Sequence, residues 1–140
     1  MESLNREPDL RVRIGPLVLP NPVGVASGTF GYGQEYQDLV DIDALGALYT
    51  KAVSIDPKSG NRPPRLVETP SGLINSIGLA NPGLPAFLDE KIPYLQSLGC
   101  PVVVNVVGET ESEYTTIVEA IEKRIGVPRE GIKGPVDGYE

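Results

Sequence analysis

The sequence contains no histidine and a single cysteine, Cys100. Histidine is the commonest general base and metal ligand in proteins, so a site of either kind would need other side chains. One cysteine excludes an internal disulfide framework and a metal site built from clustered cysteines. Cys100 directly precedes an apolar segment that we expect to be a strand, which places it roughly 20 Å from that strand's far end at ~3.3 Å per residue. We therefore expect Cys100 to be a buried structural thiol, and no other residue is an evident general base.

Long apolar runs are also missing. No run approaches the ~20 apolar residues that a membrane-spanning helix needs, and the N-terminal segment MESLNREPDLRVRIG lacks the apolar core of a secretory signal. The 19 acidic residues outnumber the 12 basic ones, for a formal net charge of −7, which disfavours a general nucleic-acid-binding surface. We expect a cytoplasmic protein that binds neither a membrane nor nucleic acid.

Glycine and proline, in contrast, are abundant, at 16 and 14 of the 140 residues. This abundance predicts many turns and substantial loops rather than long helices. A chain of this length can form one domain with a hydrophobic core. We therefore treat residues 1–140 as part of a single domain.

Apolar segments alternate with amphipathic ones, which is typical of a parallel sheet in an α/β fold. We predict a hairpin at 10–19 that turns at Gly15-Pro16, strands at 22–28, 47–54, 101–108 and from 136 onward, and helices at 34–45, 84–98 and 110–125. Gly46 is expected to cap the first helix, Pro93 to kink the second, and Thr110 with Glu113 to form a capping box for the third. An open doubly wound sheet and the first part of a (β/α)₈ barrel both fit this order.

A long segment, 55–83, separates the second predicted strand from the next helix. Connections of this length in compact domains are usually functional or disordered, and its apolar runs argue against disorder. The stretch RLVETPSGLINSI alternates well enough to be a hairpin that turns at 70–72. The uncharged stretch TPSGLINSIGLANPG places Asn75 and Ser76 among leucine, isoleucine and glycine, which suits neither a core strand nor a solvated loop.

In either architecture, ligands bind at the carboxyl ends of the strands. The polar residues at those ends and in the long loop are Ser27, Thr50, Lys51, Asn75, Ser76 and Asn105. Ordinary structural explanations exist for three of them: a tight turn for Ser27, a side chain that reaches solvent for Lys51, and a backbone hydrogen bond for Asn105. A buried lysine, however, must find a partner or lose its charge, so we favour a functional role for Lys51.

Four motifs together resemble a known family. ASGTFGYG, YTKAVS, NRPPRLVETPSGLINSIGLANPG and VVVNVVG are similar to the N-terminal half of dihydroorotate dehydrogenase, class 1B, the NAD-linked catalytic subunit. The similarity runs from about Leu10 to Glu140, and NSIGLANPG is its most specific part. The resemblance implies a flavin-binding (β/α)₈ barrel and an oxidoreductase of pyrimidine (UMP) biosynthesis that oxidises dihydroorotate to orotate with FMN.

The resemblance also implies a mechanism and roles for individual residues. A base takes the C5 proton, a hydride passes from C6 to the flavin, and the electrons reach NAD through a partner subunit that carries FAD and a [2Fe–2S] cluster. Ser27, Lys51, Ala52 and Asn105 would bind the cofactor, and Lys51, Asn75, Ser76, Ile77, Gly78 and Leu79 would bind the substrate. We expect the predicted hairpin to fold over the barrel mouth with its apolar side packed down, and we expect no metal site.

The family pattern extends beyond the motifs found here. The strand that begins at VDGYE would continue into a segment such as LNVSCPN, which supplies the catalytic cysteine, so we expect the base to lie beyond Glu140. The stretch KRIGVPREGIKGP looks irregular for the family. We expect the isolated chain to be inactive, colourless, and either oligomeric or poorly folded, because four strands leave open sheet edges. Two alternatives are a related flavin barrel of the dihydropyrimidine dehydrogenase type and an inactive fragment that acts as a folding or interaction module.

Overall fold

A parallel sheet lies at the centre of the fold. The computed structural model describes residues 8–126 and 136–140. Strands β3 (Leu48–Tyr49), β6 (Val102–Val104) and β7 (Gly138–Tyr139) pair in that order, and both pairings are parallel. Beyond the regular ladder, Val53 and Val106 form one more parallel bridge, so the pairing reaches the ends of both predicted strands. The predicted α/β class and these three strands are therefore confirmed, while the described residues form no closed barrel.

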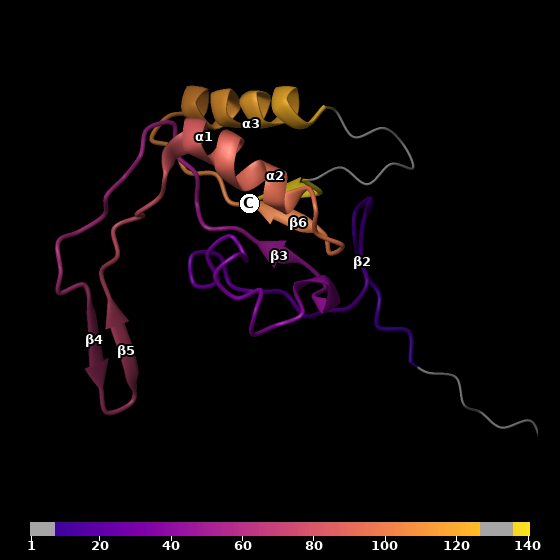
Figure 1. The fold of residues 1–140 in the computed structure, drawn as a ribbon, viewed down its shortest axis with the longest axis horizontal. Coiled ribbons are helices and arrows are strands. Elements are labelled where there is room, and N and C mark those ends of the chain that lie inside the picture. Colours follow the sequence, from indigo (N-terminus) through magenta and orange to yellow (C-terminus); the bar gives the residue numbers. More distant parts are fainter. Residues whose placement is uncertain (1–7, 127–135) are drawn as a thin grey trace, which may run out of the picture.

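Helices cover one face of this sheet (Figure 1). Helix α1 (Gly83–Ala86), a π-helical segment η2 (Phe87–Lys91) and α2 (Ile92–Leu95) follow one another without a break, and α3 (Glu111–Ile125) lies beside them. The core between the sheet and these helices contains Leu48, Val53, Leu84, Phe87, Ile92, Leu95, Val102, Val104, Val106, Ile117 and Ile121. Burial of these apolar side chains holds the helices on the sheet.

The helix predicted over 84–98 is present, with an irregularity just before Pro93. The Ile92 N–H donates to the Phe87 carbonyl, five residues back, which defines the π turn. Proline has no N–H to continue the α-helical pattern, and such a local π turn accommodates the missing donor. The predicted disturbance at Pro93 therefore takes the form of a π turn.

Both predicted ends of α3 are confirmed. The Thr110 hydroxyl accepts a hydrogen bond from the Glu113 N–H at 3.3 Å, as in a capping box. The Glu113 carboxylate accepts from the Glu109 N–H at 2.7 Å, one residue before the position that a standard box uses. Gly126 ends the helix with φ +77°, a conformation that favours glycine.

The N-terminal hairpin is also confirmed. Strands β1 (Val12–Ile14) and β2 (Leu17–Leu19) pair antiparallel, and Ile14 lies opposite Leu17. The two residues of the loop are therefore Gly15 and Pro16, with Gly15 at φ +58°. Two predictions, for the segment MESLNREPDLRVRIG and for the stretch KRIGVPREGIKGP, concern in part residues 1–7 and 127–135, which lie outside the described residues.

The buried strand predicted at 22–28 is wrong. Its only pairing is a single parallel bridge between Gly24 and Ala47, and the side chain of Val23 is 59% exposed. The Val23 carbonyl accepts from the N–H groups of Gly46 and Ala47. The segment is thus attached to the sheet on one side, while the part of the chain that the structure describes supplies no strand on its other side.

The helix predicted at 34–45 is also wrong. Turns occupy this segment, followed by a short 3₁₀ helix, η1 (Ile42–Ala44). Asp41 interrupts the helix because its backbone is extended and its carboxylate accepts from the Asp43 N–H, which starts a new turn. Leu39, placed on the apolar face by the predicted spacing, is instead 79% exposed.

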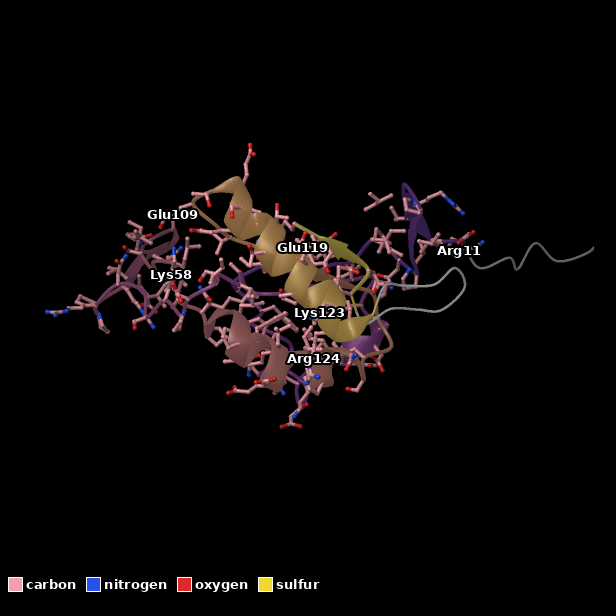
Figure 2. The ribbon with its side chains drawn as sticks, turned by 90° about the horizontal axis from the view of Figure 1, so that it is seen from above. Arg11, Lys58, Glu109, Glu119, Lys123 and Arg124 are labelled. Atoms are coloured by element: carbon pink, nitrogen blue, oxygen red, sulfur yellow. The ribbon has the colours of Figure 1, made fainter. Side chains whose placement is uncertain are left out.

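Two ion pairs lie on the surface around α3 (Figure 2). Arg124 reaches Asp89 of η2 at 3.9 Å, and Lys58 of the long loop reaches Glu109 at 3.6 Å. These side chains are largely solvent-exposed, so each pair contributes little to stability.

Within residues 8–126 and 136–140, no helix has the length and apolar character required to cross a membrane.

Gly46 has a different role from the predicted helix cap. A Cβ at this position would overlap the Asn21 carbonyl oxygen and lie 2.8 Å from the Val23 oxygen. Both are backbone atoms, which cannot move aside as the end of a flexible side chain can. Gly46 is therefore required for the close approach of the 21–23 backbone to the start of β3.

The substitution Gly46→Ala should lower the free energy of unfolding by about 1–3 kcal/mol, because the added methyl overfills a closely packed backbone contact. Gly138→Ala is the matched control, since the nearest atom to its added Cβ lies 3.9 Å away. Urea unfolding followed by circular dichroism measures both effects. Equal stabilities for the two variants would show that the 21–23 segment is not tightly held.

Candidate functional site

Three segments bring polar side chains together at the carboxyl edge of the sheet. The Asn105 side-chain amide donates to the Ser27 hydroxyl at 2.8 Å, and that hydroxyl donates to the Thr50 carbonyl at 2.9 Å. The Thr50 hydroxyl accepts from the Asn105 backbone N–H at 3.2 Å. The structure thus places Ser27, Thr50 and Asn105 in one network, although these residues lie far apart in the sequence.

Lys51 lies next to this network on the segment that continues β3. Its backbone N–H donates to the Gly31 carbonyl at 2.9 Å, which fixes the position of its Cα. The residue is half-buried, and its ammonium forms no hydrogen bond or ion pair with any described residue. A half-buried cation without a protein partner is available to an anionic ligand.

The loop around Tyr32 covers the segment on which Lys51 and Ala52 lie. The Tyr32 hydroxyl donates to the Ala52 carbonyl at 3.4 Å, and its ring packs at a tilt against Phe87, with centroids 5.8 Å apart. Burial, followed by the charge of Glu35, raises the pKa of Tyr32 well above its usual range. The phenol therefore stays protonated and remains a donor.

Lys91 fastens this loop to the helical segment. Its ammonium donates to the Gln34 side-chain oxygen at 3.0 Å and lies 5.6 Å from the centre of the Tyr32 ring. A cation at this distance from an aromatic ring is attracted to it. Together these contacts connect η2 to the backbone that supports Lys51.

A hollow of about 510 Å³ lies beside Ser27. It is lined by Leu19, Pro22, Gly24, Val25, Ala26, Ser27, Tyr49 and Glu140. Side chains alternate along a strand, and Leu48 packs into the core under the helices, so Tyr49 projects from the opposite face. The hollow therefore opens on the sheet face that the helices do not cover.

The predicted substrate residues lie in the long loop, away from this edge. Strands β4 (Leu66–Thr69) and β5 (Gly72–Asn75) form the predicted hairpin, which projects from the body of the molecule (Figure 1). Asn75 and Ser76 are exposed. Within the described ranges, no hydrogen bond joins residues 75–79 to Ser27, Lys51 or Asn105.

The hairpin turns at the predicted place, because Thr69 pairs with Gly72. Its apolar side chains are not packed down, however, and the expectation that they would be is wrong. More than half of the side chain is exposed in each of Leu66, Val67, Leu73 and Ile74. The described residues provide no surface beneath the hairpin, so these side chains have nothing to pack against.

The segment after the hairpin adopts a left-handed turn and is held in place by side-chain amides. Gly78 has φ +75° and Leu79 has φ +54°. The Asn61 amide donates to the Ser76 hydroxyl at 2.8 Å, and the Asn61 N–H donates to the Ile77 carbonyl at 3.0 Å. The backbone of the predicted substrate segment therefore has a defined conformation even though its side chains are exposed.

Asn81 is a residue that the sequence reasoning did not single out. It is 8% exposed, and its amide donates to the Leu79 carbonyl and the Ser54 hydroxyl, each at 2.9 Å. The available signal was an amide inside the apolar stretch GLANPG, directly before a Pro-Gly pair. Asn81 thus connects the predicted substrate segment to the strand segment that carries Lys51.

Cys100 is 1% exposed and precedes β6 at the amino end of the sheet, so its predicted burial is confirmed.

The expected absence of a metal site is neither supported nor contradicted. Among the residues that the structure describes, no group of three or more acidic, cysteine or histidine side chains could hold a metal ion.

Comparison with known proteins identifies the family. The family model described as dihydroorotate dehydrogenase matches residues 9–128. Proteins named "Dihydroorotate dehydrogenase B (NAD(+)), catalytic subunit" are similar to this chain: 50% identity over 117 residues in Geotalea uraniireducens, 47% over 117 in Geobacter sulfurreducens and 49% over 120 in Thermodesulfovibrio yellowstonii. The matches cover 84–86% of this chain, which spans only 38–40% of the length of these relatives.

The fold is similar to that of a solved structure. A dihydroorotate dehydrogenase from Eimeria tenella, crystallised with ferulenol, superposes with a TM-score of 0.64 at 22% identity, over 87% of this chain and 36% of the other. At this identity the likeness establishes the fold alone. The match to the family model covers most of the sequence, and the chain therefore belongs to the dihydroorotate dehydrogenase family.

Proposed function

We propose that this chain is the N-terminal, flavin- and substrate-binding portion of a dihydroorotate dehydrogenase, an oxidoreductase of pyrimidine biosynthesis that converts dihydroorotate to orotate. One observation carries the proposal. In a chain of this family, Ser27, Lys51 and Asn105 lie at the carboxyl edge of a parallel sheet, where ligands of such sheets bind. Residues 1–140 would then be the first part of a single (β/α)₈ barrel domain.

The side chains at this edge fit the ring of FMN. A flavin ring is flat and carries carbonyl oxygens and nitrogens that need both donors and acceptors. Lys51 offers an unpaired ammonium, and the Asn105 side-chain oxygen accepts no hydrogen bond within the described residues. Ser27 lies at the rim of the adjoining hollow, and Ala52 is next to Lys51. We propose that these four residues contact the cofactor.

FMN, when bound, supplies a hydride acceptor. The chain's own contribution would be to position the substrate and stabilise charge. Lys51 would carry out the second task, because orotate and the reduced cofactor are both anionic. A cation in a site that excludes water stabilises such charge far more than a surface cation does. None of the described residues at this edge is an evident acceptor for the C5 proton, and we propose that the base lies beyond Glu140.

The loop residues Asn75, Ser76, Ile77, Gly78 and Leu79 would bind the pyrimidine. For these residues to contact a substrate bound near Lys51, the segment must lie over the strand ends. Buried amides and backbone groups suit a flat heterocycle with alternating carbonyl and N–H groups. The side-chain amide of Asn75 forms no hydrogen bond with any described residue, which supports this role.

The relatives are named as catalytic subunits of an NAD(+) enzyme. By analogy, we propose that electrons pass from this chain's cofactor to NAD through a partner subunit that carries FAD and a [2Fe–2S] cluster. We further propose that the enzyme is cytoplasmic and oligomeric.

A chimera tests the proposed function. Residues of this chain would replace the matching segment of the Geotalea uraniireducens relative, which is 50% identical. The purified chimera should retain FMN and form orotate from dihydroorotate, measured by orotate absorbance with the electron-transfer subunit present. A folded chimera that retains FMN but forms no orotate would contradict the proposed function.

Within this chimera, Lys51→Ala should lower the rate constant for orotate formation by about 10²–10³-fold, comparable to removal of one oxyanion-stabilising donor. Lys123→Ala is the control, since Lys123 is an exposed lysine in the last turn of α3. Steady-state kinetics at saturating dihydroorotate give the comparison. Near-normal turnover in Lys51→Ala would remove this residue from the site.

Asn75→Ala should weaken orotate binding by about 1–3 kcal/mol and leave FMN binding nearly unchanged, because it deprives the pyrimidine of a polar partner. Ser71→Ala, at the turn of the hairpin, is the control. Fluorescence titration with each ligand measures the two affinities. Equal losses for orotate and FMN would mean that the loop shapes the whole pocket.

A further inference from the structure

Asn81 lies where the long loop returns to the sheet, and its side chain uses all of its principal hydrogen-bonding groups. The amide donates to the Leu79 carbonyl and the Ser54 hydroxyl, both at 2.9 Å. The side-chain oxygen accepts from the Gly83 N–H at 2.9 Å and from the Ser54 N–H at 3.3 Å. Such a satisfied buried network holds its members in one arrangement.

The backbone of Asn81 adds two further bonds. Its N–H and carbonyl pair with the carbonyl and N–H of Lys58, at 2.9 and 3.0 Å. The outgoing and returning arms of the long loop are thereby fixed to each other at the edge of the sheet. Gly83 begins helix α1, so the same side chain also fixes the start of that helix relative to the loop.

Leu79 shows why this anchoring matters. Its φ of +54° is in the left-handed region, which costs free energy for a residue with a branched side chain and persists only when its surroundings enforce it. The Leu79 carbonyl accepts from the Asn81 amide, which favours this conformation. Asn81 therefore holds the Leu79 end of the 77–79 backbone, while Asn61 holds Ile77.

Asn81 also connects this backbone to the strand that carries Lys51. Ser54 follows Lys51 on the same extended segment, and both its N–H and its hydroxyl bond to Asn81. The Ser54 hydroxyl in turn donates to the Asp56 carbonyl at 2.7 Å. A rigid connection of buried hydrogen bonds thus runs from the Lys51 strand to Leu79.

We propose that Asn81 is a positioning residue for substrate binding: it sets the conformation of residues 77–79, and their placement relative to Lys51, without touching the substrate itself. The proposal rests on the proposed function, because it takes residues 75–79 as the pyrimidine-binding segment. One part of the proposal, that Asn81 controls the conformation of the loop backbone, can be tested without a measurement of enzyme activity.

The substitution Asn81→Asp removes the amide hydrogen-bond donor of Asn81 and keeps the shape of its side chain. The substitution keeps the acceptor oxygen for Ser54 and Gly83 but removes the amide that donates to Leu79. When ionised, the introduced carboxyl turns a second acceptor toward the Leu79 carbonyl. When protonated, it can again donate one hydrogen bond. The defect should therefore be large where the carboxyl is ionised, near pH 8, and should become smaller as the carboxyl is protonated toward lower pH.

Asn21→Asp is the matched control. The Asn21 amide donates to the Ala44 carbonyl at 3.0 Å and its oxygen accepts from the Val23 N–H at 3.0 Å, a similar pattern far from the loop. The charged residues on the segments that contact Asn81 are Asp56, Lys58 and Glu109, and they are the same in the native chain and in both variants.

Hydrogen exchange of the purified chimera, corrected for intrinsic rates, is the first measurement. In Asn81→Asp at pH 8, exchange at the N–H groups of Ser76 and Asn81 should accelerate by about 10- to 100-fold, as expected for loss of buried hydrogen bonds. The acceleration should diminish at pH 5, while exchange in α3 stays unchanged. Unaltered exchange of these two groups, or equal acceleration in Asn21→Asp, would overturn the proposal.

Kinetics of the chimera provide the second measurement. Asn81→Asp should raise KM for dihydroorotate about tenfold at pH 8, with KM recovering toward pH 5 and FMN content unaffected. An unchanged KM, or a pH-independent loss of FMN, would overturn the positioning role. If the unsubstituted chimera forms no orotate, the proposed function fails instead, and hydrogen exchange still decides whether Asn81 holds the segment.

Discussion

The parallel pairing of β3 with β6 is the constraint on which the rest of the structure depends. Leu48 lies opposite Val102, and the parallel pairing resumes, shifted by one residue, at the bridge between Val53 and Val106. Because the pairing is parallel, the carboxyl ends of both strands reach the same edge of the sheet. The apolar side chains of Val102 and Val104 in β6 pack against the helices. The same strand pairing therefore positions both the core and the candidate site.

Polar groups at this edge are satisfied largely by one another. One network contains Asn105, Ser27 and Thr50. A second network joins Asn81 to Ser54, which follows Thr50 and Lys51 along the chain. Within the described residues, no buried side-chain nitrogen or oxygen lacks a hydrogen bond. Lys51 differs, because the residue is half-buried beside these networks and its ammonium forms no hydrogen bond or ion pair with any described residue. That contrast distinguishes the group best suited to a ligand from the groups that hold the scaffold.

Prediction from the sequence succeeded where the signal is local and failed where burial depends on distant residues. The two hairpins and α3 were predicted correctly, because turn residues and capping residues such as Gly15 and Thr110 act on their immediate neighbours. The helix at 34–45 was not, since Asp41 starts a new turn within it and Leu39 faces solvent. At the candidate site, the sharing of one edge by Ser27 and Asn105 followed from the parallel-sheet rule, whereas the anchoring role of Asn81 did not.

By itself, the sequence determined the α/β alternation, the turns, the burial of Cys100 and the set of polar residues near the strand ends. These features follow from side-chain period and local backbone preference. Only the tertiary structure decided that the Asn105 amide bonds to Ser27, that Gly46 serves a close backbone approach, and that Asn81 connects Ser54 to Leu79. Such contacts join residues far apart in the chain, and their geometry depends on how the whole sheet and its loops pack.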